Sequence, residues 1–300
     1  TVGGLINGFG IEASSHKYGL FQHICESLEI VTANGELVKC SKDANSELYY
    51  AIPWSYGSLG FLVCAEIKIV PCKDYVHLTY ITYTSKQALV DRFTEESLKP
   101  FDEAYEFIEG LMYSEQEGVL MLGNFADKVP AGTTRNALNN FWKPWFYEHV
   151  RSILKQNKEQ EEYIPLRHYY HRHTRSFFWE MEQIVPFGNS TWFRYLLGWM
   201  SPPEISLIKL TETEAIHELY DVHHMDQDLL LPISTLDQSL SYFHQEVDFY
   251  PLWLCPMRVF DTPIRGMVNP LANEQMFVDV GIYGEPTVPN YKAKDTTRKL

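Results

Sequence analysis

The residues with the clearest capacity for chemistry open the chain. Gly3, Gly4, Gly8 and Gly10 lie among apolar residues in the first ten positions. Glycine has no Cβ and tolerates positive φ, so its backbone can approach a bulky ligand, and successive exposed N–H groups can hold a pyrophosphate. The spacing differs from G-x-G-x-x-G and no strand precedes it, which argues against a Rossmann site. Two interpretations remain, a structural glycine turn and a phosphate-binding loop.

A second segment rich in ionisable side chains lies between residues 163 and 175. Its imidazole and guanidinium groups could bind an anion or hold a proton for transfer. His171 and His173 are two positions apart, which suits a strand, but no further ligand completes a metal pattern. We therefore expect no metal, and the alternatives are an anion-binding or proton-donating site and an ordinary polar segment. The cluster comprises Arg167, His168, His171, Arg172, His173 and Arg175.

Composition excludes several classes of protein. The net charge is −14 and no long basic run occurs, which argues against a nucleic-acid partner. The five cysteines are odd in number and form no C-x-x-C, so we expect buried free thiols rather than disulfides or a zinc site. Neither a G-x-S-x-G nucleophile elbow nor a P-loop is present. No run reaches the roughly 18 apolar residues of a membrane span.

The first part of the chain predicts an α+β unit with two glycine-rich turns. Asn34-Gly35 is the strongest short hairpin signal, and Pro71 stops the last strand of the unit. Residues 71–74 are the best candidate boundary, which predicts domains at 1–74 and 75–300. The predicted elements are strands at 27–32, 36–40 and 61–70, a helix at 45–51 and the second glycine turn at 53–60.

After residue 75, alternating strands and helices predict an antiparallel sheet covered by helices, so the whole chain is expected to be α+β. The predicted strands are 77–84, 107–113, 118–125, 204–210, 249–254 and 277–284. The predicted helices are 86–98, 141–158, 191–200, 213–224 and 233–246.

The predicted helix at 191–200 is unusually aromatic. Arg194 is its lone charge, among Trp192, Tyr195 and Trp199. Core packing is the simplest interpretation of such a helix. It could equally form a wall of an apolar pocket or a face that rests on a bilayer, where Trp and Tyr favour the interface. The sequence leaves these three alternatives open.

The order and spacing of these motifs resemble a known flavoprotein family. The first part resembles the second half of the flavin-binding domain of the vanillyl-alcohol-oxidase superfamily, and the later part is similar to the delta-24 sterol reductase family. The first resemblance rests on Thr1–Gly10, Asn34-Gly35, Ser46–Ala51, Gly57–Val63 and Pro71. The second rests on Phe141–Phe146, Tyr163–Arg175, Phe193–Trp199 and Tyr250–Pro256.

The resemblance implies a fold, a cofactor and a substrate. The fold would be the second half of a PCMH-type FAD-binding domain followed by a sterol-binding cap domain that is incomplete at its C-terminus. FAD would be the cofactor, NADPH the electron source, and the delta-24 side-chain double bond of a sterol the group reduced. The implied FAD contacts are Thr1, Val2, Gly3, Gly4, Leu5, Ile6, Asn7, Gly8, Phe9, Gly10, Ile11, Glu12 and Ala13, with Gly57, Gly60 and Val63 on the other side.

Reduction of an unactivated alkene needs a hydride at one carbon and a proton at the other. The flavin would supply the hydride, so the protein has to position the sterol and control the proton. A tyrosine or histidine near the flavin could give that proton. The candidates are Tyr170, His171 and His173, with Arg175 as an orienting charge.

The resemblance also implies a location at the endoplasmic reticulum membrane, or the Golgi, with the catalytic part facing the cytosol. The chain opens without Met on a glycine segment, so we expect an internal fragment whose membrane anchor lies elsewhere. Two rival functions remain. A related FAD-dependent alcohol or sugar-lactone oxidase is disfavoured by the aromatic second part, and a non-catalytic sterol-binding scaffold by the intact glycines.

Overall fold

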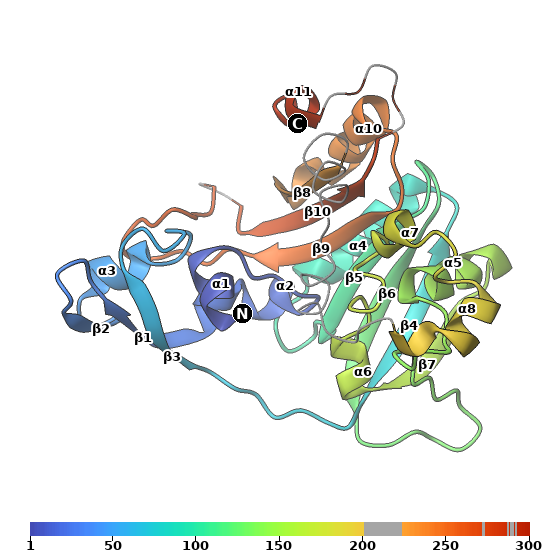
Figure 1. The fold of residues 1–300 in the computed structure, drawn as a ribbon, viewed down its shortest axis with the longest axis horizontal. Coiled ribbons are helices and arrows are strands. Elements are labelled where there is room, and N and C mark those ends of the chain that lie inside the picture. Colours follow the sequence, from blue (N-terminus) through green and yellow to red (C-terminus); the bar gives the residue numbers. More distant parts are fainter. Residues whose placement is uncertain (201–223, 272–273, 287, 289–290, 292) are drawn as a thin grey trace.

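The computed structural model describes residues 1–200, 224–271, 274–286, 288, 291 and 293–300. The described residues form two antiparallel sheets, one of three strands and one of seven. The small sheet lies at one end of the molecule and the large sheet at the other, with the N-terminal helices α1 and α2 between them (Figure 1). The predicted α+β class, with an antiparallel sheet covered by helices, is confirmed.

The small sheet is built around the predicted hairpin. Strand β1 (Cys25–Val31) pairs with β2 (Leu37–Ser41) on one side and with β3 (Phe61–Ile67) on the other. Gly35 in the connecting turn has a φ of +79°, which a residue without a Cβ adopts readily. Helix α3 (Ser46–Ala51) adds Tyr49 to the small apolar core, so both the hairpin and this helix are confirmed.

The glycine segment at the N-terminus is helical, and the predicted turn or loop there is wrong. Helix α1 spans Val2–Asn7, and Thr1 Oγ1 accepts the Gly4 N–H at 3.2 Å. Gly3 and Gly4 lie inside this helix, and neither they nor Gly8 and Gly10, which follow, have a positive φ. The capping hydroxyl and the fully buried Ile6 stabilise this turn of helix against the low helix propensity of glycine. Two short helices follow, α2 (Ser15–Tyr18) and η1 (Phe21–Ile24).

The large sheet carries most of the apolar core. Its central strands contain long apolar runs, and every pairing in it is antiparallel. Across the sheet the strands are β7 (Gln160–Pro165), β4 (Tyr75–Tyr83), β6 (Gly118–Ala126), β5 (Phe107–Met112), β9 (Leu252–Arg258), β10 (Met276–Gly284) and β8 (Met225–Pro232).

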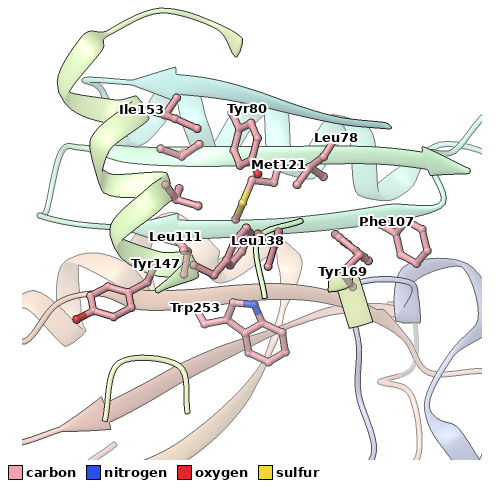
Figure 2. Packing of buried hydrophobic residues seen from close by; sticks show 14 of the residues in the cluster. Leu78, Tyr80, Phe107, Leu111, Met121, Leu138, Tyr147, Ile153, Tyr169 and Trp253 are labelled. Atoms are coloured by element: carbon pink, nitrogen blue, oxygen red, sulfur yellow. The ribbon is translucent and has the colours of Figure 1, made fainter. Parts of the chain in front are cut away.

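Helices cover both faces of this sheet. Helices α4 (Lys86–Leu98) and α10 (Leu236–Glu246) pack on one face, and α5 (Phe146–Gln156) packs on the other. Figure 2 shows Tyr80 and Met121 on the face that meets α5, near Ile153 of that helix. The face toward α5 also carries the side chains discussed below.

The segment between α5 and β8 contains short helices. The strand-like spacing of His171 and His173 is misleading, because helix α6 ends at Tyr170 and the chain continues in turns. The predicted strand at 204–210 and nearly all of the predicted helix at 213–224 lie outside the described residues. The remaining elements are α6 (Leu166–Tyr170), α7 (Met181–Ile184), α8 (Thr191–Leu196), η2 (Gly198–Met200), η5 (Ile233–Thr235) and α11 (Ala293–Thr297).

The cysteines are all free, but they are not all buried. Cys25, Cys40 and Cys255 are buried as predicted, whereas Cys64 and Cys72 are exposed, so the prediction of buried thiols is wrong for these two. Cys64 lies on β3, an edge strand whose outer face is open, and Cys72 lies in the connection to β4. In the described part of the chain, no helix combines the length and the apolar character needed to cross a bilayer.

The predicted boundary at 71–74 falls in the connection between the two sheets. The residues before β1 nevertheless pack on the large sheet. Leu20 forms one apolar cluster with Met257 and Val259. The N-terminal segment therefore belongs physically to both halves, and the division into 1–74 and 75–300 stays a prediction.

Candidate functional site

Side chains of helix α2 connect the glycine segment to the large sheet through hydrogen bonds. The Nε2–H of His16 donates to the Tyr105 carbonyl at 2.9 Å. Lys17 Nζ and the Tyr18 hydroxyl bind Glu106 at 3.0 and 2.7 Å. Burial lowers the pKa of His16 to about 4, so its ring is neutral at physiological pH. These contacts fix the position of the glycine segment relative to β5.

The two glycine segments lie side by side. The Trp54 N–H donates to the Ile6 carbonyl at 3.3 Å, and the Tyr56 N–H donates to the Asn7 carbonyl at 2.8 Å. Gly57, which follows in the second segment, has a φ of +75° and is exposed. The structure therefore brings together the two sets of residues for which FAD contact is predicted.

The backbone at Gly3 and Gly4 is open on one side. A Cβ placed at Gly3 would meet nothing within 4 Å, and one at Gly4 would meet only Thr1 Oγ1 at 3.1 Å. Packing within the protein therefore does not require glycine at position 3, whereas a ligand lying against the backbone would. This open stretch fits a bulky cofactor such as FAD.

The other implied FAD contacts differ in exposure. Val2, Glu12 and Val63 are exposed. Ile6 and Ala13 belong to the apolar cores, so their side chains support the segment from inside the protein. FAD contact by any of these residues stays a prediction. Thr1 is exposed, Gly10 is buried, and Leu5, Asn7, Gly8, Phe9, Ile11 and Gly60 are half-buried.

A buried ion pair lies on the sheet face toward the glycine segment. The Nε and Nη2 atoms of Arg172 donate to the two carboxylate oxygens of Glu109 on β5, at 2.6 and 2.9 Å. The Trp253 indole N–H donates to the same carboxylate at 3.0 Å. Arg172 Nη2 also lies 3.6 Å from a carboxylate oxygen of Glu12, whose side chain is exposed. One buried cation thus links the sheet to the glycine segment.

The electrostatics of this cluster are set by Arg172. Burial alone would raise the pKa of Glu109, but the Arg172 guanidinium and the His173 ring hold that pKa well below its usual range. Glu109 is therefore ionised at neutral pH. The guanidinium also stacks on the ring of Tyr169, 4.4 Å from its centroid. Hydrogen-bond partners from the protein surround both charged side chains. Such pairing is the condition for a buried charge to be tolerated.

His173 completes the buried cluster. Its Nε2–H donates to Glu109 at 3.2 Å, and its ring stacks on Phe178 with centroids 4.2 Å apart. Burial and then the nearby Arg172 charge lower its pKa, so the ring is neutral. Its Nδ1 atom has no hydrogen-bond partner among the described residues. With its proton held by Glu109, His173 is better suited to accept a proton than to donate one.

Tyr170 lies at the open edge of the same cluster. Its side chain is half exposed and packs edge-on against Phe107. Burial, followed by the charges of Cys72, Glu106 and Glu12, raises its pKa. The hydroxyl therefore keeps its proton at neutral pH and remains accessible. A protonated side chain at an accessible edge is able to donate a proton, although the raised pKa makes it a weaker acid than an ordinary tyrosine.

The other two predicted catalytic residues have different partners. His171 is exposed and lies 3.3 Å from the Thr174 hydroxyl. Arg175 donates to the backbone carbonyls of Asn140 and Lys143. Among the described contacts, neither reaches Glu109 or Arg172. The structure brings Tyr170 and His173 toward Glu12 and leaves His171 and Arg175 outside that group.

Another buried carboxyl group, that of Asp279, lies farther along the sheet. Asp279 on β10 alternates with Val278 and Val280, which face α4 and α10, so it lies on the opposite face, toward the glycine segment. It is fully buried, and neither of its carboxyl oxygens has a hydrogen-bond partner among the described residues. Burial and then the negative charge of Asp228 raise its pKa well above the usual value. Asp279 therefore ionises at a higher pH than an exposed aspartate does.

Sequence reasoning missed Glu109 and Asp279. Each is the only carboxylate in an otherwise apolar strand, Phe107–Met112 and Met276–Gly284. A lone carboxylate in such a run must either be paired or stay protonated. That signal was available in the sequence, although it does not identify the partner. In the described part of the chain, no group of three His, Cys, Asp or Glu residues is arranged to hold a metal.

A cavity of about 180 Å³ lies elsewhere, between the small sheet and the loop after β9. His23, Tyr50 and Phe260 are among the residues that line it. None of its lining residues belongs to the Glu109 cluster, although one of them, Pro53, begins the second glycine segment.

Comparison with known protein families identifies the class of domain that the first part of the chain resembles. Residues 1–41 match the family model described as an FAD binding domain. These residues include the open glycines, Glu12 and helix α2. The first part of the chain is thus similar to an FAD-binding domain, and the α+β fold is consistent with such a domain followed by a cap.

The whole chain is also similar to particular enzymes. It is 51% identical over 301 residues to the Delta(24)-sterol reductase of Macaca fascicularis and 50% identical over 301 residues to that of Homo sapiens, covering all of this chain and 57% of each relative. It is 46% identical over 307 residues to the Delta(24)-sterol reductase of Arabidopsis thaliana, covering 95% of this chain and 54% of that protein. The predicted resemblance to delta-24 sterol reductases is confirmed. The chain spans a little over half the length of these curated relatives.

We predict that Glu109→Gln destabilises the protein by about 3–5 kcal/mol, because it leaves the buried Arg172 charge unpaired. Urea unfolding measures the change. The matched control is Glu95→Gln, which removes an exposed carboxylate 3.2 Å from Arg92 and should cost less than about 1 kcal/mol. Equal losses in the two variants would contradict the role given to the Glu109–Arg172 pair.

The Asp279 carboxyl should make stability depend on pH. Because its pKa is raised in the folded state, its contribution is complete below the unfolded pKa of about 3.9 and is lost as pH rises toward the folded pKa. Asp279→Asn cannot ionise, so the decline in stability above pH 4 should be shallower in this variant. Urea unfolding at several pH values tests this, with the exposed Asp43→Asn as control. A slope unchanged by Asp279→Asn would show that Asp279 ionises normally.

Proposed function

We propose that the whole protein reduces the delta-24 side-chain double bond of a sterol, with FAD as the hydride carrier and NADPH as the electron source. The observation that carries this proposal is the similarity of the entire chain to proteins named Delta(24)-sterol reductase. FAD is further supported by the family match at residues 1–41 and by the open backbone at Gly3 and Gly4. The proposal for NADPH rests on the resemblance alone.

Tyr170 is the residue that we propose as the proton donor. When bound, the flavin supplies a hydride to one alkene carbon, and the other carbon needs a proton. The Tyr170 hydroxyl keeps its proton at neutral pH and lies at the accessible edge of the cluster. His173 fits this role less well, because its ring is neutral and its one N–H donates to Glu109.

Arg172 and Glu109 act as positioning residues in this proposal. Their bidentate pair holds the 166–173 segment on the sheet, and the 3.6 Å contact with Glu12 extends the same support to the glycine segment. Arg175 has a structural role instead, because its donors are used by two backbone carbonyls.

We further propose that the protein works at the endoplasmic reticulum membrane, or the Golgi, with the catalytic part facing the cytosol. A segment outside this chain would anchor it. A sterol is a largely apolar molecule that partitions into bilayers, so a membrane location would give the enzyme access to its substrate.

The direct test uses the whole protein, purified in detergent and supplied with NADPH and desmosterol. We expect a flavin absorbance spectrum and conversion of desmosterol to cholesterol. A flavin-containing protein that does not convert the sterol but consumes oxygen with a polar alcohol would favour the oxidase alternative. A colourless protein that still binds sterol would favour the scaffold.

Tyr170→Phe should lower kcat by about 10²–10⁴-fold while FAD stays bound, because it removes only the hydroxyl proton. The comparison is His171→Gln, which alters a neighbouring exposed side chain and should change kcat little. Steady-state kinetics with sterol and a flavin absorbance spectrum measure both effects. Full activity in Tyr170→Phe would exclude this residue as the donor.

Gly3→Val should abolish FAD retention without unfolding the protein. The new side chain has open space on the protein side, yet it would occupy the surface that we assign to the cofactor. Ala44→Val, at an exposed position outside both glycine segments, is the control. Flavin absorbance per protein and the thermal unfolding midpoint are the readouts. A Gly3→Val protein with its full flavin content would refute this placement of the cofactor.

A further inference from the structure

Helix α8 and the turn η2 carry apolar side chains on their outer side. Trp192, Tyr195, Leu196 and Trp199 have the spacing i, i+3, i+4 and i+7, and they are 54%, 64%, 68% and 65% exposed. In an ordinary surface helix this spacing forms the stripe that packs on the core. Here the stripe faces outward, and α8 has no buried residue. Core packing, the simplest interpretation of this helix, is therefore wrong.

The inner side of α8 is fixed to the protein by an arginine. Arg194 Nη1 donates to the Trp142 carbonyl at 2.8 Å, and its Nε donates to the Asn189 carbonyl at 2.9 Å. Gly198 packs against the Phe141 carbonyl so closely that a Cβ there would lie 2.8 Å from the oxygen. The outward direction of the stripe is thus set by specific contacts on the opposite side.

Neighbouring aromatic rings widen this surface. The Phe187 ring stacks on Trp192 with centroids 5.8 Å apart, and Phe187 is itself exposed. Trp142 is also exposed, and its backbone carbonyl accepts the hydrogen bond from Arg194. Contiguous exposed apolar surface of this kind usually marks an interaction site. The aromatic patch comprises Trp142, Phe187, Trp192, Tyr195, Leu196 and Trp199.

The charges around the patch favour one kind of partner. No Asp or Glu occurs between residues 183 and 200, although the chain has 39 of them and a net charge of −14. Residues 183–200 thus contribute no carboxylate that lipid phosphates would repel, and Lys143 and Arg194 are cations of the described segments that form the patch. Trp and Tyr concentrate where hydrocarbon meets lipid headgroups, because their rings are apolar and their tips polar. Between residues 183 and 200 the sequence has no basic cluster that would select anionic lipids.

We infer that the aromatic patch binds the headgroup–acyl boundary of a zwitterionic phospholipid bilayer. The stripe would lie in the plane of the interface, as in other amphipathic membrane-surface helices. This surface is separate from any anchor outside the chain, and the inference does not depend on the proposed reaction.

The test measures quenching of tryptophan by lipid in the whole protein. Phosphatidylcholine vesicles carry bromine on the acyl chains, and bromine quenches only a tryptophan that enters the bilayer. We expect quenching in the wild type and loss of most of it in the Trp192→Phe/Trp199→Phe variant. These changes keep aromatic rings in place, so the fold is preserved. The control is Trp54→Phe, whose ring packs against Phe9 far from the patch in the sequence and should leave quenching unchanged.

Two outcomes would overturn the inference. Wild-type protein that sediments with the vesicles and is not quenched would mean that the patch stays out of the bilayer. Shielding of the patch tryptophans from aqueous iodide on raising the protein concentration without lipid would assign the surface to a second copy of the chain instead.

Discussion

The candidate site depends on one buried ion pair, Glu109 with Arg172. Removing two charges from water is costly, and such a pair is tolerated only when its geometry is good and its remaining hydrogen bonds are satisfied. Here the contact is bidentate, and Trp253 and His173 donate the further hydrogen bonds to the carboxylate. Because Arg172 must stay paired with Glu109, the turn after α6 is held against β5. From this position Arg172 also reaches Glu12 of the glycine segment.

Burial shifts the pKa values of Glu109 and Asp279, two of the buried carboxyl groups on this sheet face, together with nearby charges of opposite sign. Glu109 has a cation beside it and is ionised, whereas burial and the nearby Asp228 raise the pKa of Asp279. Both shifts follow from burial combined with the sign of the nearest charge. The face therefore carries a fixed negative charge at Glu109 and a carboxyl group with a raised pKa at Asp279. Both groups lie among buried apolar residues, which strengthens each electrostatic effect.

Much of the fold could be predicted from hydrophobic periodicity, and the elements that were missed have physical explanations. Helix α4 and strand β10 follow apolar patterns that burial imposes, and both were predicted. Strands β7 and β8 were missed because they are the edges of the large sheet, where polar residues such as Glu161 and Asp226 are tolerated. Helix α1 was missed because its glycines favour a turn locally, while Thr1 capping and core contacts decide otherwise.

The candidate site could be predicted only in part, because some of its contacts join residues that are far apart in the sequence. Local clustering of ionisable groups indicated Tyr170 and His173, but the partner of Arg172 is 63 residues away and no spacing rule connects them.

The most direct test of the account is an experimental structure of the whole protein with FAD bound. We expect the flavin against Gly3 and Gly4, with its ring facing Tyr170 and the Arg172–Glu109 pair. Flavin bound away from both segments would contradict it.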